Sequence, residues 1–205
     1  MKDISSLVDD FYKRLQESSE DLGSGIIESI TDFFNLAVGG AHTSRAASLL
    51  DDMVKEASKW VGVHELLGSP GKGVNAFRKA VDDSAAGEPW CCAFVQYCAR
   101  SVGLRNGTES TLYPTELCLT MWQKTPQEYR IQRPIPGSII VWNYPGTIRG
   151  HTGIVVGVDK KGYVNTIEGN TATPGWTNDR GVNRKLRSME GTENMEVLGF
   201  LVPFV

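Results

Sequence analysis

The sequence predicts an α+β protein in which N-terminal helices pack on an antiparallel sheet. Apolar residues recur at helical spacing through much of residues 3–103, whereas β-branched and aromatic runs typical of strands gather in residues 137–202. Helices followed by strands along one chain favour this fold class over alternating α/β units. The chain has 205 residues, which suits one ordinary domain with a modest extension.

Composition excludes several classes of protein. The hydrophobic content of 40% and charged content of 22% are those of a soluble globular protein. A net charge of −3 with no basic stripe argues against nucleic-acid binding. The first ten residues lack the pattern of a signal peptide, and no run approaches the roughly 18 apolar residues that span a bilayer. We expect the protein to be synthesised in the cytoplasm, so any action outside the cell would require its release or delivery. We also expect it to be a monomer.

The first 45 residues predict a helical hairpin that extends the main domain of residues 46–205. Residues 3–22 form an amphipathic pattern, and a second apolar stripe covers residues 26–37 after a glycine-rich break. The polar faces are not rich in lysine. Packing against the main domain is therefore favoured over a role at a membrane surface or a partner.

A third helix is expected from Ser44 to Gly62, and a fourth over residues 75–81. The loop of residues 68–73 between them has the glycines of a phosphate-binding loop but not its spacing, which excludes a nucleotide site. Acidic residues then precede the next helix, but they lack the alternating ligand spacing of a calcium loop, so solvated charges are favoured and calcium dependence stays open. These residues are Asp82, Asp83 and Glu88.

The helix after Pro89 carries a cysteine, Cys91, in its first turn. There the helix dipole and the unpaired N–H groups predict a lowered thiol pKa and a nucleophile, although a buried structural cysteine is the common alternative. Cys91 and Cys98 lie about 10 Å apart along a helix, too far for a disulfide. We expect four free thiols and no zinc site, since no group of four ligands is evident. The remaining cysteines are Cys92 and Cys118.

Strands are expected at residues 137–142, 151–158, 162–168 and 196–202. A hairpin that closes between Lys160 and Lys161 places His151 opposite Asn170, with Glu168 diagonal to it on the same face. A shift by one residue would move these polar side chains to the other face.

A cysteine nucleophile needs a base that moves its proton and a third group that orients the base. His151 fits the role of base, and Glu168 or Asn170 fits the role of orienting group. The alternative is that His151 lies at a strand end and has polar neighbours only by chance. This alternative becomes less favoured because a cysteine, a histidine and an orienting residue occur together.

Four segments taken together resemble the CHAP domain, the cysteine- and histidine-dependent amidohydrolase/peptidase of phage endolysins and bacterial wall hydrolases. They are Pro89-Trp90-Cys91-x-Ala93-Phe94-Val95, Pro136-Gly137-x-Ile139-Ile140-Val141-Trp142, Gly150-His151-Thr152-Gly153-Ile154-Val155 and Ile167-Glu168-Gly169-Asn170-Thr171. The resemblance extends over about residues 55–205. It implies a papain-like fold and hydrolysis of an amide in peptidoglycan, either the muramoyl-L-alanine bond or a bond of the peptide stem or cross-bridge.

By this resemblance Cys91 is the nucleophile, His151 the base, and Glu168 with Asn170 the orienting pair, with no cofactor or metal required. Cys92 stands where the family usually has alanine; because adjacent helical residues point about 100° apart, only one thiol can face His151, and we choose Cys91. Ser138 replaces a common aspartate. Aromatic candidates for substrate contact are Trp90, Trp142, Tyr144 and Trp176, with core packing equally expected for Trp90 and Trp142.

Two other readings remain open. An injected interbacterial effector, acting as an amidase or deamidase, would use the same triad, and a neighbouring immunity gene rather than a holin gene would indicate it. A non-catalytic wall-binding or tail-associated module would keep the fold but leave Cys91 unreactive toward thiol reagents.

Overall fold

The computed structural model describes residues 4–17, 41–66, 69–70, 72–81, 89–159, 161–173, 175 and 179–205. The predicted second helix at residues 26–37, the acidic residues Asp82, Asp83 and Glu88, and Trp176 lie outside the described residues. The described helices are α1 (Ile4–Glu17), α3 (Ala41–Ser58), α4 (Lys72–Lys79), α5 (Cys91–Asn106), α6 (Cys118–Lys124) and the short 3₁₀ helix η1 (Gln127–Tyr129).

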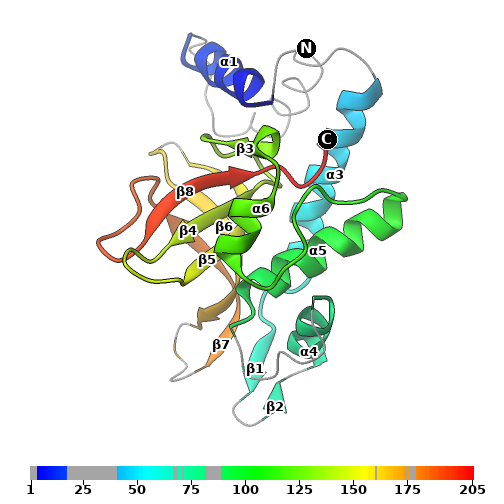
Figure 1. Cartoon of the computed structure of the whole chain (residues 1–205), viewed down its shortest axis with the longest axis vertical. Helices are drawn as coiled ribbons and strands as arrows, with labels where there is room; N and C mark the ends of the chain where they lie inside the picture. The colour runs from blue at the N-terminus through cyan, green and yellow to red at the C-terminus, as the bar shows by residue number, and fades with distance from the viewer. Residues whose placement is uncertain are drawn as a thin grey trace.

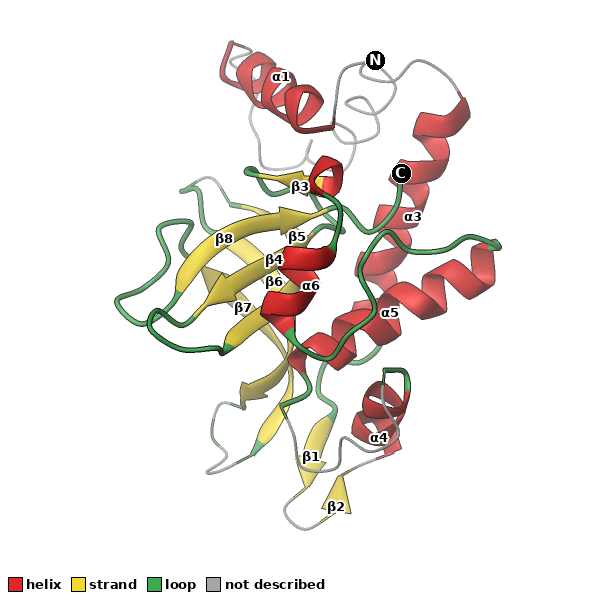
Figure 2. Ribbon diagram, viewed as in Figure 1, coloured by secondary structure: helices red, strands yellow, loops and turns green. Residues whose placement is uncertain are grey.

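The described strands form one sheet in the order β2-β1-β7-β6-β5-β4-β8-β3, and every adjacent pair is antiparallel. Figure 2 shows α3, α4 and α5 on one side of these strands, which establishes an α+β fold. The strands are β1 (His64–Leu66), β2 (Ser69–Pro70), β3 (Arg130–Ile131), β4 (Ile139–Asn143), β5 (Gly150–Val158), β6 (Val164–Ala172), β7 (Arg180–Arg187) and β8 (Glu196–Leu201).

The four predicted strands are confirmed as β4, β5, β6 and β8, with ends that differ by a few residues. The sequence analysis missed β7, whose sequence RGVNRKLR is dominated by charged and polar residues. Only Gly181 and Val182 are buried along it, so β7 lacks the apolar alternation that reveals a strand. It pairs with β6 on one side and with β1 on the other, and so connects the β5–β6 hairpin to β1 and β2 at one edge of the sheet.

Helix α5 is the central helix of the core, and α3, α4 and the sheet pack around it (Figure 1). Gly169 on β6 permits the closest approach: a Cβ atom at this position would lie 2.8 Å from the Cβ of Phe94. Any larger residue at 169 would push α5 away from the sheet. The start of α5, which carries Cys91, is therefore held against the strand that carries Glu168.

The β5–β6 hairpin has the predicted register at the strand pairs next to His151 and Glu168. Ile154 pairs with Ile167 and Val155 with Thr166, as a closure between Lys160 and Lys161 predicts. The register then shifts by one residue, and Gly157 pairs with Asn165. The bulge means that the turn itself is not symmetric about the predicted centre.

Helix α1 contacts the rest of the described chain through Val8, which is buried, and through an ion pair of 3.1 Å between Arg133 Nε and Asp9 Oδ1. Tyr12 donates its hydroxyl to the carbonyl of Pro134. Helix α3 begins at Ala41, before the predicted boundary between residues 45 and 46, and the division into extension and main domain stays a prediction.

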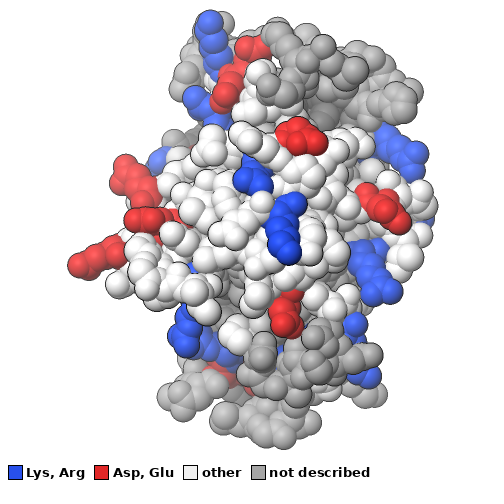
Figure 3. Space-filling view, in the orientation of Figure 1, with Lys and Arg blue, Asp and Glu red and all other residues white. Residues whose placement is uncertain are grey.

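No helix among the described residues is both long enough and apolar enough to cross a bilayer. On the face drawn in Figure 3, basic and acidic side chains of the described residues are interspersed rather than gathered into a basic stripe. The absence of nucleic acid among the partners remains a prediction.

Candidate active site

Cys91 is the first residue of α5 and lines a cleft of about 1210 Å³. Trp90 occupies the N-cap position, and no side chain there caps the first-turn N–H groups. Those donors and the positive end of the helix dipole thus lie beside the sulfur. Cys91 is only 4% exposed, so its thiol is reached through the cleft alone.

His151 and Glu168 meet across the β5–β6 hairpin, as the predicted register requires. His151 Nε2 lies 2.8 Å from Glu168 Oε2, and interaction with the Cys91 thiol is one of the causes that raise the pKa of the His151 ring. Gly153 provides the space, because a Cβ atom there would lie 2.5 Å from Cγ of Glu168. The structure therefore brings His151 into contact with Glu168 and close to Cys91.

Glu168 is fully buried and is surrounded by donors. Arg187 donates from Nε to Oε1 at 2.8 Å and from Nη2 to Oε2 at 2.5 Å, and Thr166 donates its hydroxyl to Oε1 at 2.5 Å. Burial alone would raise the pKa of this carboxyl, but the hydrogen bonds and positive charges of Arg187 and His151 lower it to about 2. Glu168 is accordingly an anion across the physiological pH range.

The sequence analysis missed Arg187, because it belongs to the unpredicted strand β7. Its guanidinium lies 5.4 Å from the ring centre of Trp142, and Trp142 stacks on His151 with ring centres 5.5 Å apart and planes 20° apart. Arg187 thus holds the Glu168 carboxylate through two hydrogen bonds, and Trp142 holds the His151 imidazole by stacking on it. No local sequence motif marks Arg187; only the register of β7 against β6 would have found it.

The pKa values of the two reactive groups are both raised. For His151, burial favours the neutral ring, but hydrogen bonds and charge from Cys91 and Glu168 outweigh it and raise the pKa from 6.5 to about 9. For Cys91, the hydrogen bond with Cys118 and burial raise the thiol pKa, and His151 opposes them. The sequence analysis expected a lowered thiol pKa from the helix start alone; the neighbouring thiol and the enclosed position account for the difference.

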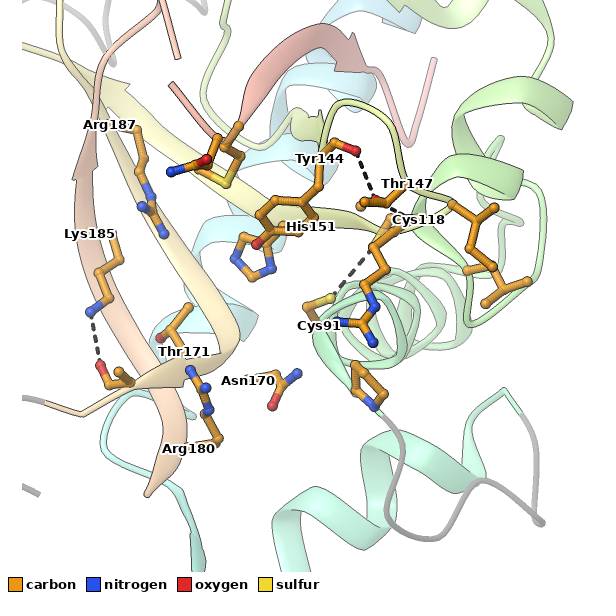
Figure 4. A pocket seen from close by; sticks show the side chains of 18 of the residues that line it. Cys91, Cys118, Tyr144, Thr147, His151, Asn170, Thr171, Arg180, Lys185 and Arg187 are labelled. Atoms are coloured by element: carbon orange, nitrogen blue, oxygen red, sulfur yellow. Dashed lines mark hydrogen bonds between the residues drawn. The ribbon is translucent and has the colours of Figure 1, made fainter. Parts of the chain in front are cut away.

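The two adjacent cysteines of α5 have different surroundings. Cys92 is fully buried, with its sulfur 3.2 Å from the carbonyl of Thr115 and 3.8 Å from Met121 Sδ. It does not line the cleft, whereas Cys91 and Cys118 do, with their sulfurs 3.5 Å apart (Figure 4). Of the two adjacent thiols, Cys91 is the one placed beside His151.

Asn170 lines the cleft, and its predicted orienting role stays a prediction. Within the described residues, Glu168 and not Asn170 is the hydrogen-bond partner of His151. Asn170 adopts a left-handed backbone conformation with φ of 58°, which departs from the regular path of β6. Of the predicted orienting pair, Glu168 contacts His151 and Asn170 lines the cleft nearby.

The aromatic candidates separate into two groups. Tyr144 lines the cleft beside His151, as Figure 4 shows. Trp90 and Trp142 are fully buried, and the Trp90 indole donates to Glu65 Oε2 at 2.9 Å, so neither is accessible to a substrate. Their expected contacts with substrate are replaced by roles in packing. Ser138 is also buried, and its side-chain hydroxyl donates to the carbonyl of Ile135 at 2.5 Å.

No group of three or more metal-ligating side chains occurs in the described part of the chain. The remaining cleft lining mixes basic, acidic and apolar side chains. It includes Glu65, Glu116, Leu117, Thr147, Ile148, Arg149, Thr171, Arg180, Lys185, Glu193 and Met195. Such a lining suits an extended polar ligand better than a small apolar one.

Residues 83–170 match the family model described as the CHAP domain. The chain contains a CHAP domain. This match spans Cys91, His151, Glu168 and Asn170, and it ends before Arg187. CHAP domains are generally hydrolytic, acting as amidases or peptidases on peptidoglycan. No curated protein and no solved structure was found to match the chain.

Proposed function

We propose that this CHAP domain hydrolyses an amide bond of bacterial peptidoglycan, with Cys91 as the nucleophile. The contact between His151 Nε2 and Glu168 Oε2 supports the proposal, since it engages one ring nitrogen and leaves Nδ1 to exchange a proton with the Cys91 thiol, which lines the same cleft. Nucleophile, base and orienting group then stand in the order that amide hydrolysis by cysteine requires.

In the first step, His151 accepts the thiol proton through Nδ1, and the Cys91 sulfur attacks the carbonyl carbon of the scissile amide. The uncapped N–H groups at the start of α5 face the position where negative charge develops on the carbonyl oxygen, and they stabilise it. His151 then protonates the leaving amine, and the substrate acyl group remains on the sulfur as a thioester.

In the second step, His151 removes a proton from a water molecule that attacks the thioester carbonyl. The carboxylic acid leaves, and the proton returns to the Cys91 sulfur. Throughout the cycle Glu168 stays ionised and hydrogen-bonded to Nε2, so the imidazolium that forms is stabilised. Arg187 holds Glu168 in this position from β7.

The test is incubation of purified peptidoglycan with wild-type protein and with Cys91→Ala, followed by mass analysis of the released fragments and new amine termini. The control is Cys98→Ala, which removes a fully buried thiol of the same helix that does not line the cleft. Release by wild type and Cys98→Ala but not by Cys91→Ala supports the proposal, and the fragment masses identify the bond. Equal release by Cys91→Ala contradicts it.

We further propose that the protein acts on the cell wall as a monomer after release or delivery, in the manner of a phage endolysin. An interbacterial effector would share the chemistry described above. The genes beside the coding sequence separate the two: a holin gene favours the endolysin role, and a gene for an immunity protein favours the effector.

A further inference from the structure

The cleft contains a second thiol that the proposed mechanism does not use. Cys118 is the first residue of α6, is 5% exposed, and lines the same cleft as Cys91. Its sulfur lies 3.5 Å from the Cys91 sulfur. A disulfide bond is about 2.05 Å long, so the two sulfurs need to approach by roughly 1.5 Å to form one.

We propose that Cys91 and Cys118 form an oxidative modification site, in which a hydroperoxide converts the two thiols into a reversible disulfide. The regulatory meaning rests on the proposed function, because it requires Cys91 to be the nucleophile. The disulfide occupies the attacking sulfur and stops hydrolysis. It also protects that sulfur from irreversible oxidation, and a thiol reductant restores it.

The reaction balances with hydrogen peroxide as oxidant. The Cys91 thiolate attacks one peroxide oxygen, the O–O bond breaks, and hydroxide leaves with Cys91 as the sulfenic acid. The Cys118 sulfur then attacks the Cys91 sulfur, the S–O bond breaks, and water is lost as the disulfide forms. In total two thiols are oxidised and one peroxide is reduced to two water molecules.

The surroundings favour Cys91 as the sulfur that is oxidised first and Cys118 as the one that resolves it. His151 lines the same cleft as Cys91 and can accept its proton, and the uncapped N–H groups of α5 lie beside the resulting thiolate. Cys118 is adjacent and lines the same cleft, so peroxide and resolving thiol reach one sulfur without a change of fold.

Cys92 is the competing partner, because it is close enough to Cys118 to help raise the pKa of that thiol. Its sulfur is fully buried, contacts Thr115 and Met121, and does not line the cleft. Peroxide entering through the cleft meets Cys91 before Cys92. Cys98, also fully buried, is remote from the cleft lining and serves as the reference thiol.

The experiment treats purified full-length protein with a small excess of hydrogen peroxide, alkylates the remaining thiols, and maps the cysteine pairs by peptide mass analysis. We expect an intact mass lower by two hydrogen atoms, a cross-linked peptide joining Cys91 to Cys118, and full recovery of both thiols with dithiothreitol. Peptidoglycan release is measured in parallel, and it is lost on oxidation and restored on reduction.

Two variants sharpen the result. Cys118→Ser cannot form the disulfide, so peroxide drives Cys91 to sulfinic and sulfonic acids that dithiothreitol does not reverse. Cys98→Ser behaves like wild type. A disulfide mapped to Cys92 and Cys118, or over-oxidised Cys91 in wild type without any disulfide, overturns the proposal. Because the mapping needs no hydrolysis, a disulfide in a protein that releases nothing from peptidoglycan refutes the proposed function and leaves the modification site intact.

Discussion

The helices and the strands at the cleft differ in the charge state of the side chains that they contribute. On the helical wall, Cys91 and Cys118 are buried thiols whose surroundings favour the neutral form. On the sheet wall, Glu168 and Arg187 form an ionised pair that holds His151. The comparison teaches that the charged groups are concentrated on the strands, while the helices carry neutral thiols; in the proposed mechanism Cys91 becomes an anion only when His151 takes its proton.

The largest expected effect separates the two adjacent cysteines of the helical wall. Cys91→Ala lowers kcat for peptidoglycan release on the order of 10³-fold or more, since no other thiol is placed beside His151. Cys92→Ala changes kcat by less than about threefold and mainly lowers stability through a small cavity. Turbidity loss of a wall suspension gives both rates. A collapse of activity in Cys92→Ala with a native fold would exchange their roles.

The next effect tests the sheet wall through pH. In wild type, kcat/KM is expected to rise with pH toward about 9, where His151 loses its proton and can act as base. Glu168→Gln removes the anion that raises the pKa of His151. The rising limb therefore moves to lower pH, while the maximal rate falls on the order of 10²-fold. An unchanged pH profile in this variant would show that Glu168 does not set the state of the ring.

The same network predicts a pH dependence of stability. Glu168, whose pKa is lowered from 4.5 to about 2, adds stability that is present above pH 4.5 and is lost as the pH falls toward 2. His151, whose pKa is raised from 6.5 to about 9, adds stability that is present below pH 6.5 and is lost as the pH rises through 9. The difference in Tm between wild type and Glu168→Gln is thus largest between pH 4.5 and 6.5. A difference independent of pH would contradict this linkage.

Arg187→Met tests how much the hydrogen bonds from Arg187 to Glu168 contribute to the free energy of unfolding. It leaves the buried Glu168 carboxylate without its cation, at a cost of about 3 kcal/mol in the free energy of unfolding. Arg184→Met is the matched control on the same strand, where the guanidinium reaches only Ser58 Oγ at 3.2 Å from an exposed position. Urea denaturation measures both, and equal losses of stability would remove the special role of Arg187.

The smallest effect concerns Asn170. Asn170→Gly keeps the left-handed backbone accessible and removes the amide, so it tests the side chain alone. Because Glu168 holds His151, we expect kcat to change by less than about threefold. A loss comparable to that of Glu168→Gln would restore Asn170 to the orienting pair.

The sequence predicted much of this site because two local rules suffice. The helix start fixes where Cys91 lies, and the period of two along β5 and β6 places His151 near Glu168. Arg187 could not be predicted in this way, since charged residues dominate β7 and its pairing depends on the whole sheet. The raised thiol pKa of Cys91 was also missed, because Cys118 approaches from another helix, 27 positions along the chain.

The bulge in the β5–β6 hairpin has a practical consequence. Since the register changes between Val155 and Gly157, the turn beyond it is offset from the strand pairs next to His151 and Glu168. Length changes in the turn can be absorbed at this irregular point instead of sliding the strand that carries His151 along the strand that carries Glu168. The exposed turn at Lys161 and Gly162 is therefore the place to graft an affinity tag, a fluorophore or a wall-targeting peptide onto this scaffold.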